Sequence, residues 1–85
     1  MRFVFLSPDC AVDSKEITAV LDMDRATVSL DIRQLLSAAE KEGRLINAAP
    51  KLPKSLVFTN DGRIYITPLM AQTVKKRCTD TEFRQ

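Results

Sequence analysis

Two short apolar segments with a turn between them constrain the fold of this chain more than any other feature. Residues 56–59 and 64–67 are rich in branched and aromatic side chains, and Asn60-Asp61-Gly62 separates them. Such residues favour strands, and an Asp-Gly pair between two such runs is the strongest short-range signal of a β-hairpin. With a two-residue turn Phe58 would face Tyr65, whereas a three-residue turn would shift that register. We therefore expect an antiparallel pair of strands in the second half of the chain.

The length of the chain makes its own core only marginally stable. A chain of 85 residues forms one domain and buries roughly 60–65% of its unfolded surface. Disulfides, metals or oligomerisation commonly supply the missing stability. The two cysteines, Cys10 and Cys78, lack the Cys-x-x-Cys spacing of a zinc site. We therefore expect oligomerisation, with no metal and no cofactor.

The first apolar run is too short for a secretion signal. Ser7-Pro8-Asp9 ends it early, and no segment approaches the roughly 20 apolar residues that span a bilayer. These patterns predict a cytoplasmic protein that does not enter the membrane. Because that compartment is reducing, we expect Cys10 and Cys78 to be free thiols.

The first thirty residues predict strands. Arg2 to Leu6 reads as a buried strand that the following proline ends, and Val12 lies in a further extended segment. Ile17 to Leu21 alternates, which places Ile17, Ala19 and Leu21 on one face, although the adjacent Val20 and Leu21 leave a helical interpretation open.

A long helix over Leu30 to Glu42 is the clearest single element. Ser29 precedes it as a cap, because its hydroxyl can accept a hydrogen bond from a free amide of the first turn. Gly43 follows it as a left-handed stop. One apolar stripe at positions i, i+3, i+4 and i+7 faces the core: Ile32, Leu35, Leu36 and Ala39.

The remaining residues complete an α+β pattern. Arg44 to Ala48 reads as a strand, residues 49–54 as a loop with two prolines, and Thr67-Pro68 as the entry to a short helix. Leu69, Met70 and Val74 would share one side of that helix. The predicted fold is a small antiparallel or mixed sheet with one long central helix and a short C-terminal helix. It occupies a single domain over residues 1–78, followed by a frayed tail over residues 79–85.

The charge distribution favours a polyanion-binding surface over a catalytic site. The net charge is only +2, but cations gather after residue 50, whereas acids are prominent between Asp22 and Asp31. The chain has no histidine, and no nucleophile–base pair, phosphate loop or metal cluster stands out. We therefore predict that the protein is not an enzyme.

Several blocks of sequence together resemble the RemA/RemB family of small bacterial regulators of extracellular-matrix genes, and are closer to the RemB branch. The resemblance covers nearly the whole chain. The blocks are Val12-Asp13-Ser14-Lys15-Glu16-Ile17, Pro53-Lys54-Ser55-Leu56-Val57, Ile64-Tyr65-Ile66-Thr67-Pro68-Leu69 and Thr73-Val74-Lys75-Lys76-Arg77. The resemblance implies a compact α+β subunit that assembles into rings and presents repeated basic loops to DNA, as a transcriptional activator of matrix, or biofilm, operons.

The resemblance also implies DNA-contacting positions. Lys15 matches a basic residue that is associated with DNA binding in the family. Lys51 and Lys54 lie in the loop where RemA-like members carry an arginine-rich DNA contact. The arginine pair is absent here, and lysine offers phosphate a point charge in place of a bidentate fork. The partners expected are therefore the phosphate backbone of double-stranded DNA and further copies of the chain, with Arg44 as a possible neighbour of the DNA contact.

Each basic site has a simpler interpretation beside the functional one. Lys51 and Lys54 could be solvated loop charges. The secondary basic patch, Lys75, Lys76 and Arg77, could complement the negative end of its helix, or could pair with an acid of another subunit such as Asp22, Asp24 or Glu40.

Other candidate sites are weaker. Asp22-Met23-Asp24 is better explained as an exposed acidic turn than as a magnesium site, since no further ligand is evident. Four aromatic residues, Phe3, Phe5, Phe58 and Tyr65, are better assigned to core or interface packing than to base stacking. An adaptor that binds protein and not DNA is the second function left open.

Overall fold

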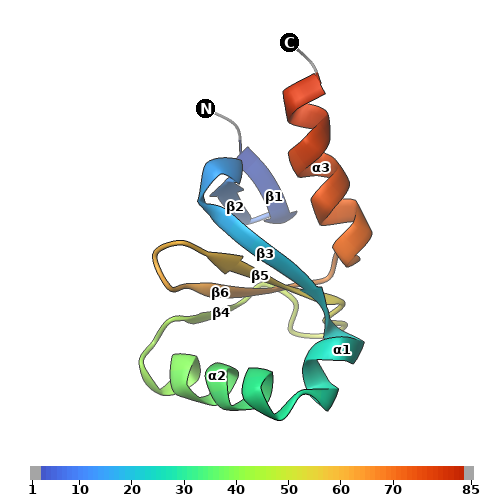
Figure 1. The fold of residues 1–85 in the computed structure, drawn as a ribbon. Helices are drawn as coiled ribbons and strands as arrows, with labels where there is room; N and C mark the ends of the chain where they lie inside the picture. Colours follow the sequence, from blue (N-terminus) through green and yellow to red (C-terminus); the bar gives the residue numbers. More distant parts are fainter. Residues whose placement is uncertain (1–2, 84–85) are drawn as a thin grey trace.

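The computed structural model describes the backbone of residues 3–83 and the side chains of residues 3–78. Within these residues the chain forms a two-stranded sheet, a four-stranded sheet and three α-helices (Figure 1), which confirms the predicted α+β class. The strands are β1 (Phe3–Ser7), β2 (Cys10–Asp13), β3 (Ile17–Asp22), β4 (Leu45–Asn47), β5 (Ser55–Thr59) and β6 (Ile64–Thr67). The helices are α1 (Met23–Val28), α2 (Leu30–Lys41) and α3 (Ala71–Phe83), with a 3-10 turn, η1, over Ser14–Glu16.

The larger sheet is mixed and contains the predicted hairpin. Its strand order is β3-β5-β6-β4, with β3 and β6 antiparallel to β5, and β4 parallel to β6. Val57 faces Tyr65 and Phe58 faces Ile64, so the two-residue-turn register that paired Phe58 with Tyr65 is wrong. The turn has three residues, because the Thr59 amide donates to the Arg63 carbonyl at 3.0 Å. Gly62 closes the turn with φ +90°, as a three-residue hairpin loop requires.

The predicted alternation along β3 is also wrong. The pairing of β3 with β5 is irregular between Ile17 and Ala19, which rotates the strand at Thr18. As a result Val20 is buried and Ile17 packs against the same core cluster, whereas Ala19 is exposed. A bulge interrupts the period of two, so an alternating pattern read from sequence assigns the wrong face beyond it.

Helix α2 forms as predicted at both ends. The Ser29 hydroxyl accepts a hydrogen bond from the Ile32 amide at 3.3 Å, and Gly43 adopts φ +75° after the last turn. Ala39 is buried, and Ile32 and Leu36 pack beneath the sheet. Leu35 is 40% exposed, so the predicted apolar stripe is narrower than expected.

Helices α1 and α3 differ from the prediction. The sequence Asp22-Met23-Asp24, expected as an acidic turn, leads into the short helix α1. Helix α3 begins at Ala71 and not at Pro68. The reason is that Thr67 ends β6 and its hydroxyl accepts a hydrogen bond from the Leu69 amide at 3.2 Å, which holds the intervening residues in a turn.

The later start of α3 changes the place of the residues assigned to it. Leu69 and Met70 precede the helix, and Met70 is 58% exposed, whereas Val74 is buried as expected. A frayed tail was expected from Thr79, but α3 continues to Phe83. Residues 84–85 lie outside the described residues.

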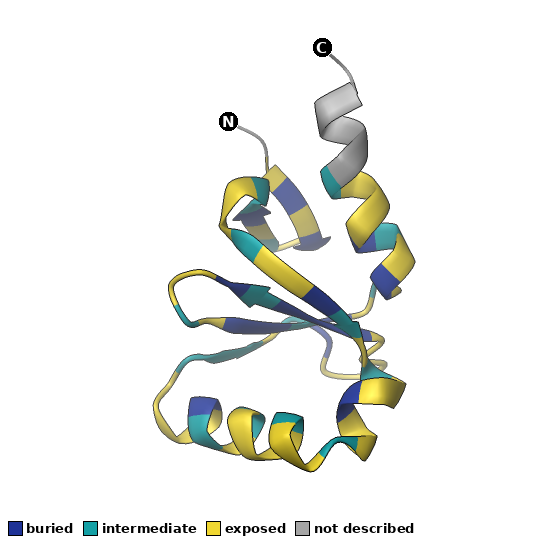
Figure 2. Cartoon of the chain, in the orientation of Figure 1, coloured by how far each residue is buried: buried dark blue, intermediate teal, exposed yellow. Residues whose placement is uncertain are grey.

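The larger sheet separates two core clusters (Figure 1). One cluster joins β1, β2 and α3 to one face of the sheet, and includes Leu6, Val57 and Val74. The other joins α1 and α2 to the opposite face, and includes Ala26, Ala39, Leu56 and Ile64. Buried positions follow the facing surfaces of these layers, while the outer faces of the helices are exposed (Figure 2).

The aromatic residues assigned to core or interface packing divide between the two environments. Tyr65 is buried and Phe58 is half-buried. Phe3 and Phe5 project from the outer face of β1 and are 54% and 55% exposed. A core role is therefore confirmed for the hairpin aromatics, and an interface role for the β1 aromatics stays a prediction.

Candidate nucleic-acid interface

The loop between β4 and β5 presents Lys51 and Lys54 to solvent. Both lysines are exposed, as are Pro50 and Pro53, whereas Ala49 and Ser55 at the loop ends are buried. The Ala49 amide donates to the Asn47 side chain at 2.9 Å, and the Ser55 hydroxyl donates to the Leu69 carbonyl at 2.7 Å. The loop is therefore fixed at both ends while its cations remain accessible.

Lys54 is held more firmly than Lys51. The Lys54 amide donates to the Thr67 carbonyl at 2.9 Å, and its own carbonyl accepts a hydrogen bond from the Met23 amide at 3.0 Å. Both backbone polar groups are thus committed, one to β6 and one to the start of α1. A fixed backbone lowers the entropy lost when the side chain binds an anion.

Acidic residues lie beside Lys54. Asp22 and Asp24 line the same hollow of about 200 Å³ as Lys54 and Met70. No carboxylate of the described residues lies within 4 Å of the Lys54 ammonium. The two aspartates therefore reduce the local positive potential without forming a contact ion pair with the lysine. Among the described residues, no three side chains of the metal-ligating types gather to hold a metal ion.

Lys15 lies at the other end of the sheet from this loop. It is exposed in η1, where its amide donates to the Asp13 carboxylate at 3.0 Å. Because Ile17 pairs with Thr59 and Asp22 with Ser55, β3 carries the chain from the hairpin turn to the loop. The six residues of β3 extend over about 17 Å, so one subunit does not bring Lys15 together with Lys51 and Lys54.

Arg44 is also distant from the loop and is engaged in structure. Its Nε donates to the Glu42 carboxylate at 2.7 Å, and its guanidinium also donates to the Gly62 carbonyl. It therefore links the end of α2 to the hairpin turn. Arg44 thus has a structural role at the hairpin turn, the end of the sheet at which Lys15 also lies, and its part in the DNA contact stays a prediction.

The basic patch of α3 occupies the first turns of that helix and not its end. Lys75, Lys76 and Arg77 are exposed, and six further helical residues follow Arg77. The suggestion that they complement the C-terminal helix dipole is therefore wrong, since that effect falls off within the last turn. Arg77 instead donates to the Phe5 carbonyl at 3.2 Å, which ties α3 to β1.

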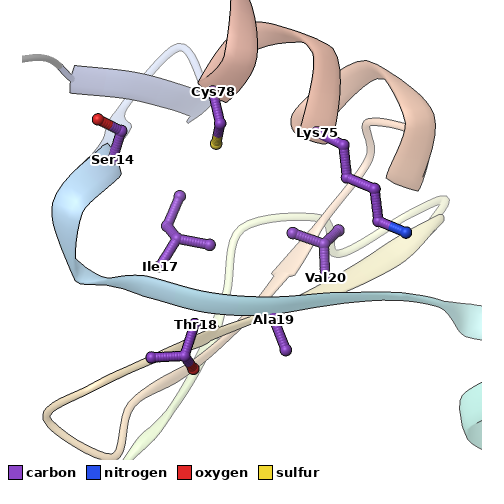
Figure 3. Close-up of a pocket in the computed structure, with 7 residues that line it drawn as sticks. All are labelled: Ser14, Ile17, Thr18, Ala19, Val20, Lys75 and Cys78. Carbon is purple, nitrogen blue, oxygen red and sulfur yellow. The ribbon is translucent and has the colours of Figure 1, made fainter. Parts of the chain in front are cut away.

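A hollow between β3 and α3 brings the α3 patch close to η1. Lys75 and Cys78 of α3, together with Ser14 of η1, line this hollow of about 410 Å³. Ile17 and Val20 point from β3 toward the helix, with the Lys75 chain running alongside Val20 (Figure 3). Ser14, the residue before Lys15, therefore lines the same hollow as Lys75, an arrangement that the sequence spacing could not reveal.

Arg63 is a basic residue that the sequence reasoning missed. It is exposed beside the hairpin turn, and its pKa is raised by a hydrogen bond to Tyr65 and by the Asp61 carboxylate. The Asp61 carboxylate lies 3.4 Å from the Arg63 guanidinium. The position of Arg63 directly after the Asp-Gly turn was the sequence signal that could have identified it as an exposed cation.

Cys10 is a free thiol, and both Cys10 and Cys78 are partly buried. Burial raises the pKa of the Cys10 thiol above its ordinary value. Because the thiolate is the reactive form, this environment makes Cys10 a poor nucleophile at neutral pH.

Comparison with known proteins assigns the chain to a regulatory family. A family model described as RemA-like, extracellular matrix regulatory protein A-like, matches residues 3–78, nearly all of the chain. No curated protein matches it. In the described part of the chain, none of the helices has both the length and the apolar character needed to cross a bilayer.

Proposed function

Because this chain belongs to the RemA-like family of extracellular matrix regulatory proteins, we propose that it regulates matrix, or biofilm, genes in the cytoplasm by binding double-stranded DNA. In this proposal the chain acts without catalysis, as a homo-oligomer of the ring type. The observation that carries the proposal is the loop of residues 49–54, which is fixed at both ends and exposes two lysines.

The chemistry of the loop favours the DNA backbone over the bases. Lys51 and Lys54 are exposed point charges that can contact phosphate, but they cannot make the bidentate contact that arginine makes with guanine. We therefore propose that the loop positions the protein on the duplex. The lysines in place of the family's arginine pair also lead us to propose membership of the RemB branch.

The separation of the basic sites favours an oligomer. One copy presents only two lysines on the loop, with Lys15 at the other end of β3, a strand about 17 Å long. Two or three phosphate contacts bind weakly, whereas linked copies multiply the effective concentration of each further contact.

A second function, an adaptor without DNA affinity, is favoured by one observation. Asp22 and Asp24 share a hollow with Lys54 and oppose its charge. In this case the loop would contact a protein partner, and phosphate would not be its ligand.

Charge reversal in the loop separates the two functions. The double change Lys51→Glu/Lys54→Glu should abolish retention on immobilised duplex DNA under the first proposal, because it places two carboxylates against phosphate. Under the second, partner capture should persist and wild-type DNA retention should already be negligible. Lys41→Glu reverses the charge of one exposed lysine on α2, away from the loop. It is the control for the effect of charge reversal alone and should leave DNA retention unchanged.

A further inference from the structure

An apolar groove runs between β1 and the segment that leads into α3. It has a volume of about 320 Å³, and its lining includes Phe5 and Pro8 on one side and Pro68 and Leu69 on the other. Phe5 is 55% exposed at its edge. Arg77 stands at the rim, where its guanidinium donates to the Phe5 carbonyl and stays exposed. Within the described residues the groove therefore combines apolar walls with a single cation.

The bend between α1 and α2 projects from the molecule, in contrast to the groove. Ser29 leaves the helical conformation there, with φ −96° and ψ 120°, and Val28 and Leu30 on either side are 82% and 61% exposed. Leu30 lies on the face of α2 opposite the buried Ala39, since nine residues at 100° each amount to a half turn beyond two full turns. The next residue, Asp31, is exposed, and no cation of the described residues lies within 4 Å of its carboxylate. The bend therefore presents two aliphatic side chains with a carboxylate beside them.

We propose that the Val28–Leu30 bend of one copy inserts into the β1–α3 groove of the next copy, with Asp31 facing Arg77. This inference rests on the oligomer of the proposed function and names its interface. The two surfaces suit each other in kind, since exposed aliphatic side chains meet an apolar groove and a carboxylate meets the cation at its rim. We assign the groove to a second copy of the chain because each copy carries the bend that complements the groove.

The places of the two surfaces determine the kind of assembly. The groove lies in the layer of β1 and α3, whereas the bend lies in the layer of α1 and α2 on the other side of the larger sheet (Figure 1). Contact between two different surfaces of identical subunits is heterologous, and it repeats until it closes into a ring or extends as a fibre. Such an assembly covers side chains that the subunit leaves in water, namely Phe5, Val28 and Leu30.

Charge reversal with rescue by mixing tests the pairing. Arg77→Glu makes both surfaces acidic, and Asp31→Arg makes both basic, so each variant alone should dissociate, with an association constant reduced about tenfold or more. In an equimolar mixture the acidic rim of the Arg77→Glu variant meets the basic bend of the Asp31→Arg variant. The unchanged Arg77 rim of the second variant likewise meets the unchanged Asp31 bend of the first. Alternating copies should then reassemble, as measured by sedimentation velocity at micromolar concentration. An unfolded variant could not be rescued in this way.

Polar substitution of the bend provides an independent measurement. Val28→Gln/Leu30→Gln should reduce assembly, whereas Leu52→Gln, at a position 69% exposed on the loop, should leave the oligomer intact. If the wild type is a monomer, both this interface and the oligomeric function fail. If the wild type assembles and none of the bend and rim variants alters it, only this interface fails. Dissociation without rescue by mixing would refute the Asp31–Arg77 pairing. Loss of DNA binding by Arg77→Glu with assembly unchanged would assign the rim to DNA.

Discussion

Replacing Thr67 with valine should destabilise the subunit far more than the loss of one surface hydroxyl would. Thr67 is fully buried, and its hydroxyl donates to the Leu6 carbonyl at 2.6 Å while accepting from the Leu69 amide at 3.2 Å. Leu6 has no partner in β2, because the register shifts between Phe5 and Ser7. The Thr67 side chain therefore satisfies a carbonyl that the irregular ladder leaves open and joins the two sheets.

The size of the effect follows from the groups left without partners. Valine matches threonine in shape, so the change removes hydrogen bonds with little loss of packing. A buried carbonyl without a donor costs about 1–3 kcal/mol, and the loss of the partly buried bond to Leu69 adds about 0.5–1.5 kcal/mol. The sum of roughly 2–4 kcal/mol is a large fraction of the total for a chain of 85 residues, which is about 4–13 kcal/mol.

Urea denaturation followed by circular dichroism measures this change. For a domain of this size 1 kcal/mol corresponds to about 4–8 °C in Tm, so the loss of about 2–4 kcal/mol should shift a parallel thermal melt by roughly 8–32 °C. Thr67→Ser, which keeps the hydroxyl, should recover most of the loss. Thr18→Val is the matched control, because its exposed hydroxyl donates to the Phe58 carbonyl at 3.2 Å and water can replace it. The reasoning is wrong if Thr67→Val loses less than about 0.5 kcal/mol, or if Thr18→Val loses as much.

Three further outcomes are expected. Ser29→Ala should lower the free energy of unfolding by about 1 kcal/mol in urea denaturation, because it removes the cap of α2. Ser37→Ala, on the exposed face of the same helix, should be nearly neutral. Equal effects of the two changes would contradict the capping role. The pKa of Asp61 is lowered, chiefly by the hydrogen bond from Thr59, so its contribution to stability is fully present above the ordinary carboxyl pKa and is lost as the pH falls through the lowered one. In an NMR titration Thr59→Val should raise the Asp61 pKa, and an unchanged value would exclude that bond as the cause. Because burial raises the pKa of Cys10, iodoacetamide at pH 8 should modify it more slowly than free cysteine, as peptide mass spectrometry would measure; equal rates would show that the thiol is not protected.

Local patterns in the sequence were sufficient for elements whose signals are local. The cap at Ser29 and the stop at Gly43 act on the backbone within a few residues, and both are confirmed. The hairpin was also found, but its register depends on whether Asn60 belongs to the turn. That choice is made by the Thr59–Arg63 hydrogen bond and by the pairing of β5 with β3, which no local pattern contains.

Tertiary contacts decided the elements that the sequence misplaced. Pro68 is a good first residue for a helix, yet the buried Thr67 hydroxyl holds the chain in a turn and α3 starts at Ala71. The bulge near Thr18 likewise depends on pairing with β5 and reverses the faces beyond it.

The candidate site was predicted in its parts but not in its arrangement. Lys51 and Lys54 lie on the expected exposed loop. Lys15 was grouped with them, but the length of β3 separates it from the loop and places its segment beside α3. Distances across a sheet depend on strand pairing, so a list of basic residues could not give them.

The salt dependence of DNA binding is the most direct test of multivalent phosphate recognition. Fluorescence anisotropy with a labelled duplex gives the slope of log affinity against log salt, which is about −0.9 for each phosphate contacted. The three lysines of one copy, Lys15, Lys51 and Lys54, can give a slope no steeper than about −2.7. If several copies contact the DNA, the slope should be steeper. The double change Lys51→Gln/Lys54→Gln should then reduce its steepness by about 1.8 for each copy in contact. A flat wild-type slope, or one that the double variant leaves unchanged, would contradict the proposal that this loop binds DNA.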